Sequence, residues 1–321
     1  MNYKYDVIAL GELLVDFAPS GESGQGNQLF EACPGGAPCN VLSMLQKLGK
    51  QTAFIGRVGA DQFGELLRNT IEEIGIDSSY LITDHHTNTT LTFVHKMPDG
   101  DREFSFYRNP GADMMLHPDD ISEEFIRQGR IFHYGTLSMT DSPAKEATEK
   151  AIYYARKNNL LLSFDPNLRL PLWKTSADAK ERMEYGFAHC DVLKIADNEI
   201  CFVTGQEDYH EGIRSLQENY HIPLILLTLG KEGSRAYYKN MIIEKKAFLQ
   251  KAPVDTTGAG DTFCGCILEY LLEHDINTLS ETDLEEMLTF ANAAASLITM
   301  KKGAVRSMPG RQEITNLSNL D

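Results

Sequence analysis

Short apolar runs alternate along the chain with longer segments in which apolar residues recur every three or four positions. Val41–Leu48 and Phe63–Ile74 have this helical spacing. The apolar runs have the length of buried strands, and they occur at Val7–Leu10, Thr52–Ile55, Ile131–Tyr134, Leu160–Phe164, Val192–Ile195 and Ile222–Thr228. Strands that alternate with helices form mostly parallel sheets covered on both faces. The pattern therefore predicts an α/β fold with a mostly parallel central sheet.

Two segments have a different pattern. Thr90–His95 and Glu103–Arg108 alternate apolar and polar residues, as half-buried strands do, and Asp99-Gly100 between them is a hairpin signal. The segment Val15–Gln28 is rich in Gly and Ser, and we expect it to pair with that hairpin as a small separate sheet. The pattern fits a lid and a simple decoration of the core equally well.

Composition and charge narrow the class of partner. The net charge of −16 argues against a nucleic acid or an anionic membrane surface, because both require a basic footprint. No run approaches the roughly 20 apolar residues of a membrane span, and Gly11 and Glu12 interrupt the first apolar run, unlike a signal peptide. The six cysteines form no CxxC pair, which is typical of packing residues in a reducing compartment. These features predict a cytoplasmic protein.

A glycine-rich turn near residue 260 is the strongest chemical signal. Gly258-Ala-Gly-Asp261 directly precedes a segment with apolar residues at 263, 266, 267, 270 and 271, and it follows the strand-like Ala252–Val254. Small residues at a helix start leave backbone N–H groups and the positive end of the helix dipole available to an anion. By itself the turn could simply cap a helix, but its surroundings favour a phosphate site.

Asp261 has two interpretations at this position. It is either an acidic residue that complements the helix dipole or the group that accepts the proton of a substrate hydroxyl. The pKa of aspartate is about 4 in water, and we expect the helix start to lower it further, which makes a weak base. A weak base suffices for phosphoryl transfer, because the loose transition state releases the proton late and catalysis rests on positioning.

Other nucleotide-binding motifs are absent from the sequence. No GxxxxGK[ST] occurs, and no GxGxxG follows a predicted strand. The sequence therefore disfavours a P-loop NTPase and a Rossmann dehydrogenase.

A second group of candidate residues comes from the first half of the chain. The run Pro34–Asn40 places two glycines and a bifunctional amide at a helix start, which by itself suits a polyhydroxylated ligand and an ordinary turn into a helix equally well. Asp16 closes the strand-like run from Gly11, and Asp165–Arg169 follows a buried strand, so both are expected at the sheet edge where α/β folds bind ligands. Arg108 ends the proposed hairpin, from which it could reach over a ligand.

Taken together, these motifs resemble the ribokinase-like (PfkB) family of sugar kinases, and within it the bacterial and plant fructokinases. The resemblance covers nearly the whole chain. It implies a single domain over residues 1–321 with a three-layer ribokinase-like fold and a β lid formed by about 15–34 and 89–110. It rests on Gly11-Glu-x-x-x-Asp16, Pro34-Gly-Gly-Ala-Pro-x-Asn40, Phe54-Ile-Gly-x-Val-Gly-x-Asp-x-Phe-Gly64, Glu103-Phe-x-Phe-Tyr-Arg108, Asp165-Pro-Asn-Leu-Arg-x-Pro-Leu-Trp173, Thr228-Leu-Gly-Lys-x-Gly233 and Asp255–Asp261.

The resemblance also implies roles for individual residues. It makes Asp261 the catalytic base and Gly258, Ala259 and Gly260 an anion hole. The sugar side is matched by Asp16, Gly35, Gly36, Asn40, Arg108, Arg169 and Asp261. The nucleotide side is matched by Thr228, Gly230, Lys231, Gly233, Gly258, Gly260 and Asn292. A loop that binds a monovalent cation in many members is matched by Asp255, Thr257, Gly303 and Ser307.

The sequence departs from the family at one motif. Many members carry Asn-x-x-Glu before the nucleotide loop, a motif linked to Mg²⁺; here Glu199 is present but Ala196 stands at the Asn position. Fructokinase-like members commonly have a small residue there, so Glu199 is expected to act on Mg²⁺ only indirectly. Mg²⁺ is expected to arrive with ATP, and K⁺ is the further cofactor that the cation loop implies.

The resulting prediction is an ATP-dependent fructokinase that phosphorylates the 6-hydroxyl of D-fructose and forms a homodimer through its lid. Another small acceptor remains open: aminoimidazole riboside or another nucleoside, 2-keto-3-deoxygluconate, or ribose. A non-catalytic sugar-binding regulator is disfavoured, because such a protein should have lost Asp261 or the glycines beside it, and all are present.

Overall fold

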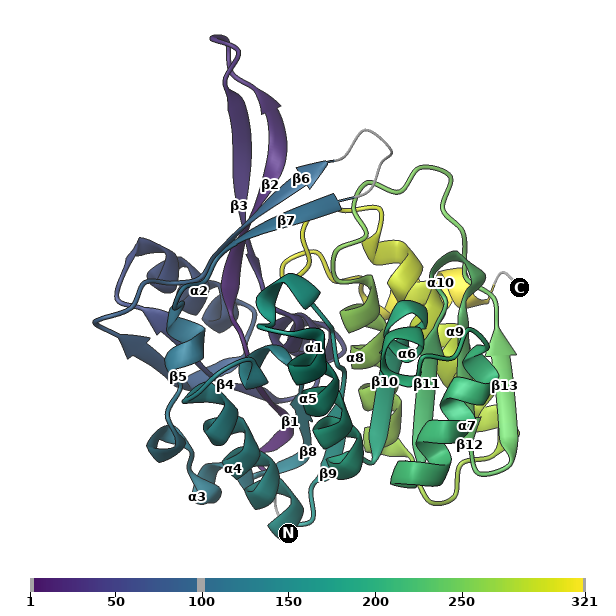
Figure 1. The fold of residues 1–321 in the computed structure, drawn as a ribbon. Coiled ribbons are helices and arrows are strands. Elements are labelled where there is room, and N and C mark those ends of the chain that lie inside the picture. The colour runs from purple at the N-terminus through teal and green to yellow at the C-terminus, as the bar shows by residue number, and fades with distance from the viewer. Residues whose placement is uncertain (1–2, 97–101, 320–321) are drawn as a thin grey trace.

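The computed structural model describes residues 3–96 and 102–319, and its central element is a sheet of nine strands (Figure 1). From one edge to the other the strands are β13 (Met241–Lys245), β12 (Ser234–Tyr238), β11 (Leu224–Thr228), β10 (Val192–Ala196), β9 (Leu161–Phe164), β8 (Gly129–Tyr134), β1 (Tyr5–Leu10), β4 (Thr52–Gly59) and β5 (Asp77–Asp84). All neighbours pair in parallel except β11–β12 and β12–β13, which are antiparallel. The predicted mostly parallel sheet is confirmed.

Successive residues of a strand point to opposite faces of the sheet, and in the central strands both sets are apolar. Helices therefore cover both faces. Ile8 and Leu10 pack in one core with α3 (Glu123–Ile126), α4 (Ala144–Lys157), α5 (Ser176–His189), α6 (Asp197–Thr204) and α7 (Tyr209–Tyr220). Val7 and Ala9 face the other side, which is covered by α1 (Ala37–Lys47), α2 (Gln62–Glu73), α8 (Ala259–Glu273), α9 (Glu281–Ile298) and α10 (Arg311–Ser318). The three layers match the expected architecture.

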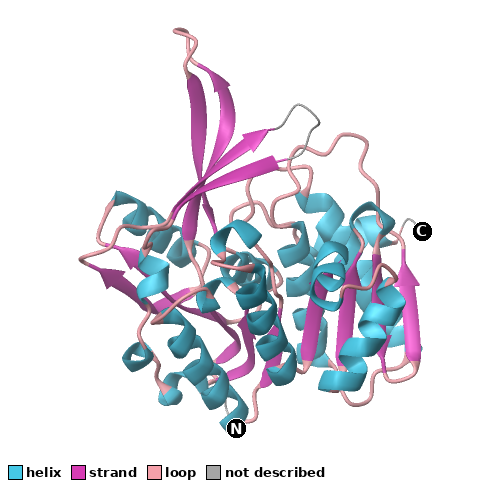
Figure 2. Cartoon of the chain, in the orientation of Figure 1, coloured by secondary structure: helices cyan, strands magenta, loops and turns pink. Residues whose placement is uncertain are grey.

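A second sheet of four strands stands apart from the first. Its order is β3 (Gln28–Gly35), β2 (Leu14–Glu22), β6 (Leu91–Lys96) and β7 (Arg102–Tyr107), with β2 and β6 parallel. Phe93 stacks on Phe17 at 4.8 Å between ring centroids and meets Phe30 edge-on, which ties the two hairpins together. Figure 2 shows the β2–β3 hairpin extending beyond the helices. The small sheet is as predicted; the turn Asp99-Gly100 lies outside the described residues.

Local predictions near the ligand-binding edge need three corrections. Ala252–Val254 is not a strand but part of a loop between β13 and α8. Asp16 does not close a strand of the central sheet: β1 ends at Leu10, and Asp16 lies near the start of β2 in the small sheet. Helix α1 begins at Ala37, four residues before the apolar spacing indicates, because Pro38 is compatible with a first helical turn.

Gly36 fixes the position of α1 relative to the segment that follows β1. Its φ is 127°, and a Cβ there would lie 2.3 Å from the carbonyl oxygen of Glu12. Only glycine fits both the backbone conformation and the contact. The close approach brings the first turn of α1, and with it Asn40, against the segment after β1.

We expect Gly36→Ala to lower the free energy of unfolding by about 3 kcal/mol, since it combines an unfavourable φ with a steric clash. Gly49→Ala is the matched control: Gly49 has φ 84°, but its added Cβ would have nothing within 4 Å. Its cost should stay at about 1–2 kcal/mol. Urea unfolding of both variants measures the difference, and equal midpoints would show that the clash is relieved at no cost.

Candidate active site

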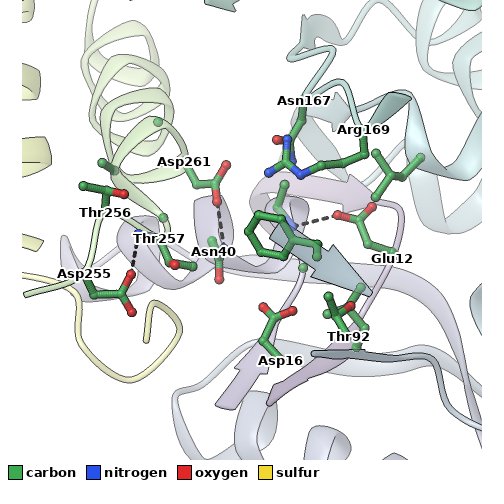
Figure 3. Close-up of a pocket in the computed structure, with 18 of the residues that line it drawn as sticks. Glu12, Asp16, Asn40, Thr92, Asn167, Arg169, Asp255, Thr256, Thr257 and Asp261 are labelled. Carbon is green, nitrogen blue, oxygen red and sulfur yellow. Dashed lines mark hydrogen bonds between the residues drawn. The ribbon is translucent and has the colours of Figure 1, made fainter. Parts of the chain in front are cut away.

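A cavity of about 730 Å³ lies between the carboxyl ends of the central strands and the small sheet. Figure 3 shows its polar groups arranged around one space: Asp261 with Asn40 on one side, Asn167 and Arg169 on another, and Asp16 near Thr92. Its walls come from α1, the loop after β9, the start of α8 and the lid strands β2, β6 and β7. Segments far apart in the chain therefore meet at one site, as expected for the edge of an open α/β sheet.

The start of helix α8 forms one wall of the cavity. Gly258 precedes the helix with φ 78°, and a Cβ there would lie 2.6 Å from Cβ of Ala304. The chain can therefore turn tightly into the helix only with glycine at this position. Gly258, Ala259 and Gly260 all line the cavity, so the positive end of the helix dipole faces it. This arrangement can hold an anion.

Asp261 is on the first turn of α8 and is only 9% exposed. Burial, and to a smaller extent the charge of Asp165, raises its pKa to about 6, against the lowering effects of Asn40, Lys194 and Arg169. The expectation that the helix start lowers this pKa is therefore wrong, because the loss of hydration outweighs the dipole. Asp261 is still ionised at neutral pH, and it is a stronger base than an exposed aspartate.

Asn40 connects the two halves of the site. Its Nδ2 donates a hydrogen bond of 2.7 Å to Oδ2 of Asp261, 221 residues away in the sequence. The other side-chain atom, Oδ1, is buried and has no hydrogen-bond partner among the described residues. A buried acceptor without a partner is costly, so a ligand hydroxyl is a fitting donor for it.

Lys194 and Asp165 form a buried ion pair at the carboxyl ends of β10 and β9. Lys194 Nζ lies 3.1 Å from Oδ2 of Asp165. Burial by itself would lower the pKa of Lys194, but the carboxylates of Asp165, Glu199 and Asp261 raise it above its ordinary value. A Cβ on Gly260 would be 3.0 Å from Nζ, so the ammonium group stands directly beside the glycine turn. The lysine is thus a fixed positive charge at the anion site.

The lid side of the cavity carries further carboxylates. Burial raises the pKa of Asp16 to about 6, although Arg169 opposes this effect. Burial raises the pKa of Glu12 to about 7, and its Oε1 accepts a 2.8 Å hydrogen bond from the amide of Ala37 at the start of α1. Gly35 leaves room for Asp16, because a Cβ there would lie 2.5 Å from Oδ2 of Asp16.

Arg169 and Asn167 reach the cavity from the segment after β9. Arg169 is followed by a single turn, Leu170–Leu172, and then by Trp173, the chain's one tryptophan, which is 9% exposed. Two atoms of Glu199 hold the neighbouring backbone: Oε1 accepts from the amide of Leu168 and Oε2 from that of Ala196. Glu199 therefore shapes this wall through the backbone.

Arg108 is not among the described residues that line the cavity. Its guanidinium group is buried and engaged by Asp113, Thr140 and the carbonyl oxygen of Leu137. The expectation that Arg108 reaches over a ligand is therefore wrong, because its guanidinium group is bound within the protein.

The residues matched to the nucleotide side form a separate group. Thr228 ends β11, and Gly230, Lys231 and Gly233 follow it in a short turn. Asn292 accepts a hydrogen bond from Ser234 and donates to the carbonyl oxygens of Lys245 and Lys246, so its amide is used within the protein. Of the residues matched to the nucleotide side, only Gly258 and Gly260 are among the described residues that line the cavity.

The four residues matched to the cation loop come from two neighbouring segments. Asp255 Oδ1 accepts from the amide of Thr257, and Oδ2 accepts from the amide of Gly303 at 3.2 Å. Ser307 lies in the same loop as Gly303, and its hydroxyl donates to the carbonyl oxygen of Lys302. Within residues 3–96 and 102–319, no cluster of three or more His, Cys, Asp or Glu could hold a metal ion.

Several lining residues were missed by the sequence analysis as members of the site. Glu12 and Lys194 carry the clearest signal in retrospect, since each is a charged residue in or directly after an apolar strand. Asn167 lay within a motif that was noted, but its role was not inferred. For Leu14, Thr92, Phe104 and Phe106 of the small sheet, a one-dimensional pattern cannot tell which face of that sheet meets the cavity. Leu137, after β8, and Thr256, in the loop before α8, reach the cavity only through the fold.

Comparisons with known proteins agree with this fold and site. The chain matches the family described as pfkB family carbohydrate kinase over residues 4–311. It is 38% identical over 313 residues to probable fructokinase-4 of Arabidopsis thaliana, covering 97% of this chain and 96% of that protein.

Two solved structures are also similar. One is a double mutant of fructokinase from Vibrio cholerae O395 with fructose, ADP and potassium ion bound (TM-score 0.89, 29% identity, 99% of both chains). The other is aminoimidazole riboside kinase from Salmonella enterica with aminoimidazole riboside and an ATP analogue (TM-score 0.84, 25% identity, 98% and 99% of the chains). The fold is thus that of the ribokinase-like kinases. The chain belongs to the pfkB family of carbohydrate kinases.

The raised pKa of Asp261 has a consequence for stability. Because the folded protein keeps a proton on this carboxyl up to about pH 6, whereas the unfolded chain loses it near pH 4, stability falls as pH rises through that window. We therefore expect Asp261→Asn to be more stable than the parent protein at about pH 8, by up to about 3 kcal/mol. The advantage should vanish below about pH 4, where both side chains are neutral.

Urea unfolding at both pH values tests this sign. The matched control is Asp275→Asn, because Asp275 is exposed and its pKa is lowered by hydrogen bonds from Asn277. Asp275→Asn should therefore lower the free energy of unfolding at about pH 8. An Asp261→Asn variant less stable than the parent protein at pH 8 would contradict the account of the buried carboxylate.

Proposed function

We propose that this protein is an ATP-dependent fructokinase that transfers the γ-phosphoryl group of ATP to the 6-hydroxyl of D-fructose. The observation that carries the proposal is the buried pair of Asn40 and Asp261 at the start of α8. It places a base and a hydroxyl-binding amide beside an anion site, in one cavity. The fructokinases among the relatives support fructose as the acceptor.

The phosphoryl group is held by charge rather than by covalent chemistry. The backbone amides of Gly258, Ala259 and Gly260 lie at the positive end of the helix dipole, which faces the phosphoryl group. Lys194 adds a fixed positive charge. Mg²⁺ bound to ATP would neutralise phosphate charge there. Glu199 acts on this wall only through the backbone amides that it holds. Charge stabilisation of this kind is what a loose transition state requires.

The acceptor is held on the other side of Asp261. Asp16, Arg169 and the free Oδ1 of Asn40 provide acceptors and donors for sugar hydroxyls. The backbone at Gly36 allows close approach, and Gly35 leaves room for Asp16. The aromatic lid residues Phe104 and Phe106 supply apolar contact and help to exclude water. Asp261 then orients the reacting hydroxyl and takes its proton late in the transfer.

The remaining matched residues have supporting roles in this proposal. The loop with Thr228, Gly230, Lys231 and Gly233 lies along the nucleotide, and Asn292 braces the adjacent backbone. Asp255, Thr257, Gly303 and Ser307 offer oxygen atoms of the kind that hard cations bind, and they adjoin the turn at Gly258. K⁺ held there would stiffen the anion site. The V. cholerae enzyme with potassium ion bound supports this role.

A nucleoside such as aminoimidazole riboside is the second candidate acceptor, because a kinase for that compound shares the fold and covers the chain almost completely. Ribose and 2-keto-3-deoxygluconate remain members of the same panel of acceptors. A reducing, cytoplasmic setting fits the six free cysteines. No helix in the described part of the chain is long and apolar enough to cross a membrane.

An ADP-release assay over fructose, ribose, glucose, mannose, 2-keto-3-deoxygluconate and nucleosides tests the proposal. We expect the highest kcat/KM with fructose. Asp261→Asn should lower kcat on fructose by about 10²–10⁴-fold, as loss of a general base does. Preference for another acceptor would overturn the substrate assignment, and a variant that kept a tenth of the activity would overturn the role of Asp261.

We also propose that the protein forms a homodimer through its lid. Leu29 on β3 is 45% exposed and Tyr107 on β7 is 65% exposed, and the β2–β3 hairpin projects away from the body (Figure 1). Exposed apolar side chains on a projecting sheet are typical of a surface that is covered by a partner. A second copy of this chain is the occupant proposed here.

Leu29→Lys should therefore shift the protein from dimer to monomer, because it places a charge in the buried part of the interface. Leu249→Lys is the matched control, since Leu249 is 69% exposed on the loop before α8 and outside the lid. Sedimentation equilibrium at micromolar concentration distinguishes the two variants. A monomeric parent protein, or a Leu29→Lys variant that remains dimeric, would contradict the lid interface.

A further inference from the structure

The β6–β7 hairpin of the lid joins the body of the protein at two points, and both are bound to the same carboxylate. Thr90, directly before β6, donates from Oγ1 to Oδ1 of Asp113 at 2.5 Å. Arg108, directly after β7, donates from Nε to Oδ2 of Asp113 at 2.8 Å. Asp113 belongs to the short helix η1 (Ala112–Met115), which is part of the body. One side chain thus fixes both ends of the hairpin.

The rest of the Arg108 guanidinium group reaches the wall of the cavity. Nη1 donates to Oγ1 of Thr140 at 2.9 Å, and Nη2 donates to the carbonyl oxygen of Leu137 at 2.8 Å. Leu137 itself lines the cavity. The side chains of Arg108 and Asp113 are only 2% and 1% exposed. The ion pair is therefore enclosed, and it connects the lid to the body without facing the acceptor.

The hairpin carries side chains that line the site. Thr92 lies two residues after the first junction, and Phe106 lies two residues before the second. Any displacement at Thr90 or Arg108 is passed to these side chains, because the intervening backbone is paired in the sheet, with Thr92 opposite Phe106. The position of the lid over the acceptor is thus set at its two junctions.

We infer that Arg108 and Asp113 are positioning residues for the transfer reaction. Together they hold the lid hairpin in place over the cavity, and Arg108 does not contact the sugar. This inference rests on the proposed kinase function. Loss of the pair should loosen the lid, which weakens acceptor binding and admits water to the anion site. The nucleotide loop is outside this cluster, so ATP binding should be little affected.

Kinetics of Arg108→Lys, Asp113→Asn and the double variant test the inference. Each single variant should raise the KM for fructose on the order of tenfold and raise ATP hydrolysis without sugar relative to transfer. The KM for ATP should stay within about twofold. The double variant should raise the KM by less than the product of the two single effects, because both substitutions remove the same ion pair. A direct sugar contact predicts otherwise: Arg108→Lys would be far more damaging than Asp113→Asn, and the effects would multiply.

Two further variants keep the test independent of folding. Thr90→Val preserves side-chain volume and leaves the ion pair intact but releases the junction before β6; an unchanged fructose KM in this variant would overturn the inference even if an ion-pair variant fails to fold. Glu149→Gln is the matched control, since it breaks the ion pair of Arg182 with Glu149 (2.9 Å) between α5 and α4, outside the lid. Its kinetics should match those of the parent protein. A parent protein inactive on every acceptor would refute the proposed function instead.

Discussion

The hydrogen bond between Asn40 and Asp261 is the interaction on which the site depends. It joins α1, which follows β3 of the small sheet, to α8, which begins far along the chain. Gly36 and Glu12 fix the start of α1 from one side, and Gly258 fixes the start of α8 from the other. The bond therefore holds the amide of Asn40 against the carboxylate of Asp261, at the helix start that can hold an anion. Such preorganisation is the main means by which phosphoryl transfer is catalysed.

The cavity also shows how a strongly acidic protein can bind an anionic substrate. The overall charge is −16, yet the positive end of α8 and the Lys194 ammonium group meet at a single point. Asp165 and Glu199 hold the lysine charged in spite of its burial. The same burial makes the carboxyl of Asp261 more basic than usual. Local geometry thus gathers positive charge at the start of α8 in a protein whose overall charge is negative.

Sequence reasoning recovered what depends on local pattern. Six buried strands of the central sheet and the helices α1 and α2 were predicted from periodicity, and the turn at Gly258–Asp261 from its small residues and the helix that follows. Three-dimensional context decided the rest. The pKa of Asp261 depends on desolvation by residues distant in sequence, which no spacing rule reveals. Arg108 looked like a ligand contact because of its place at a strand end; only the fold brings Asp113 and Leu137 to it.

Trp173 gives the molecule an internal optical probe. It is the chain's one tryptophan, it is nearly buried, and it follows the acceptor-side Arg169 by a single helical turn. Its indole Nε1 is buried without a hydrogen-bond partner among the described residues, so small shifts of this segment change the polarity around the ring. Excited at wavelengths that tyrosine does not absorb, this tryptophan gives a label-free signal from the segment that carries Arg169.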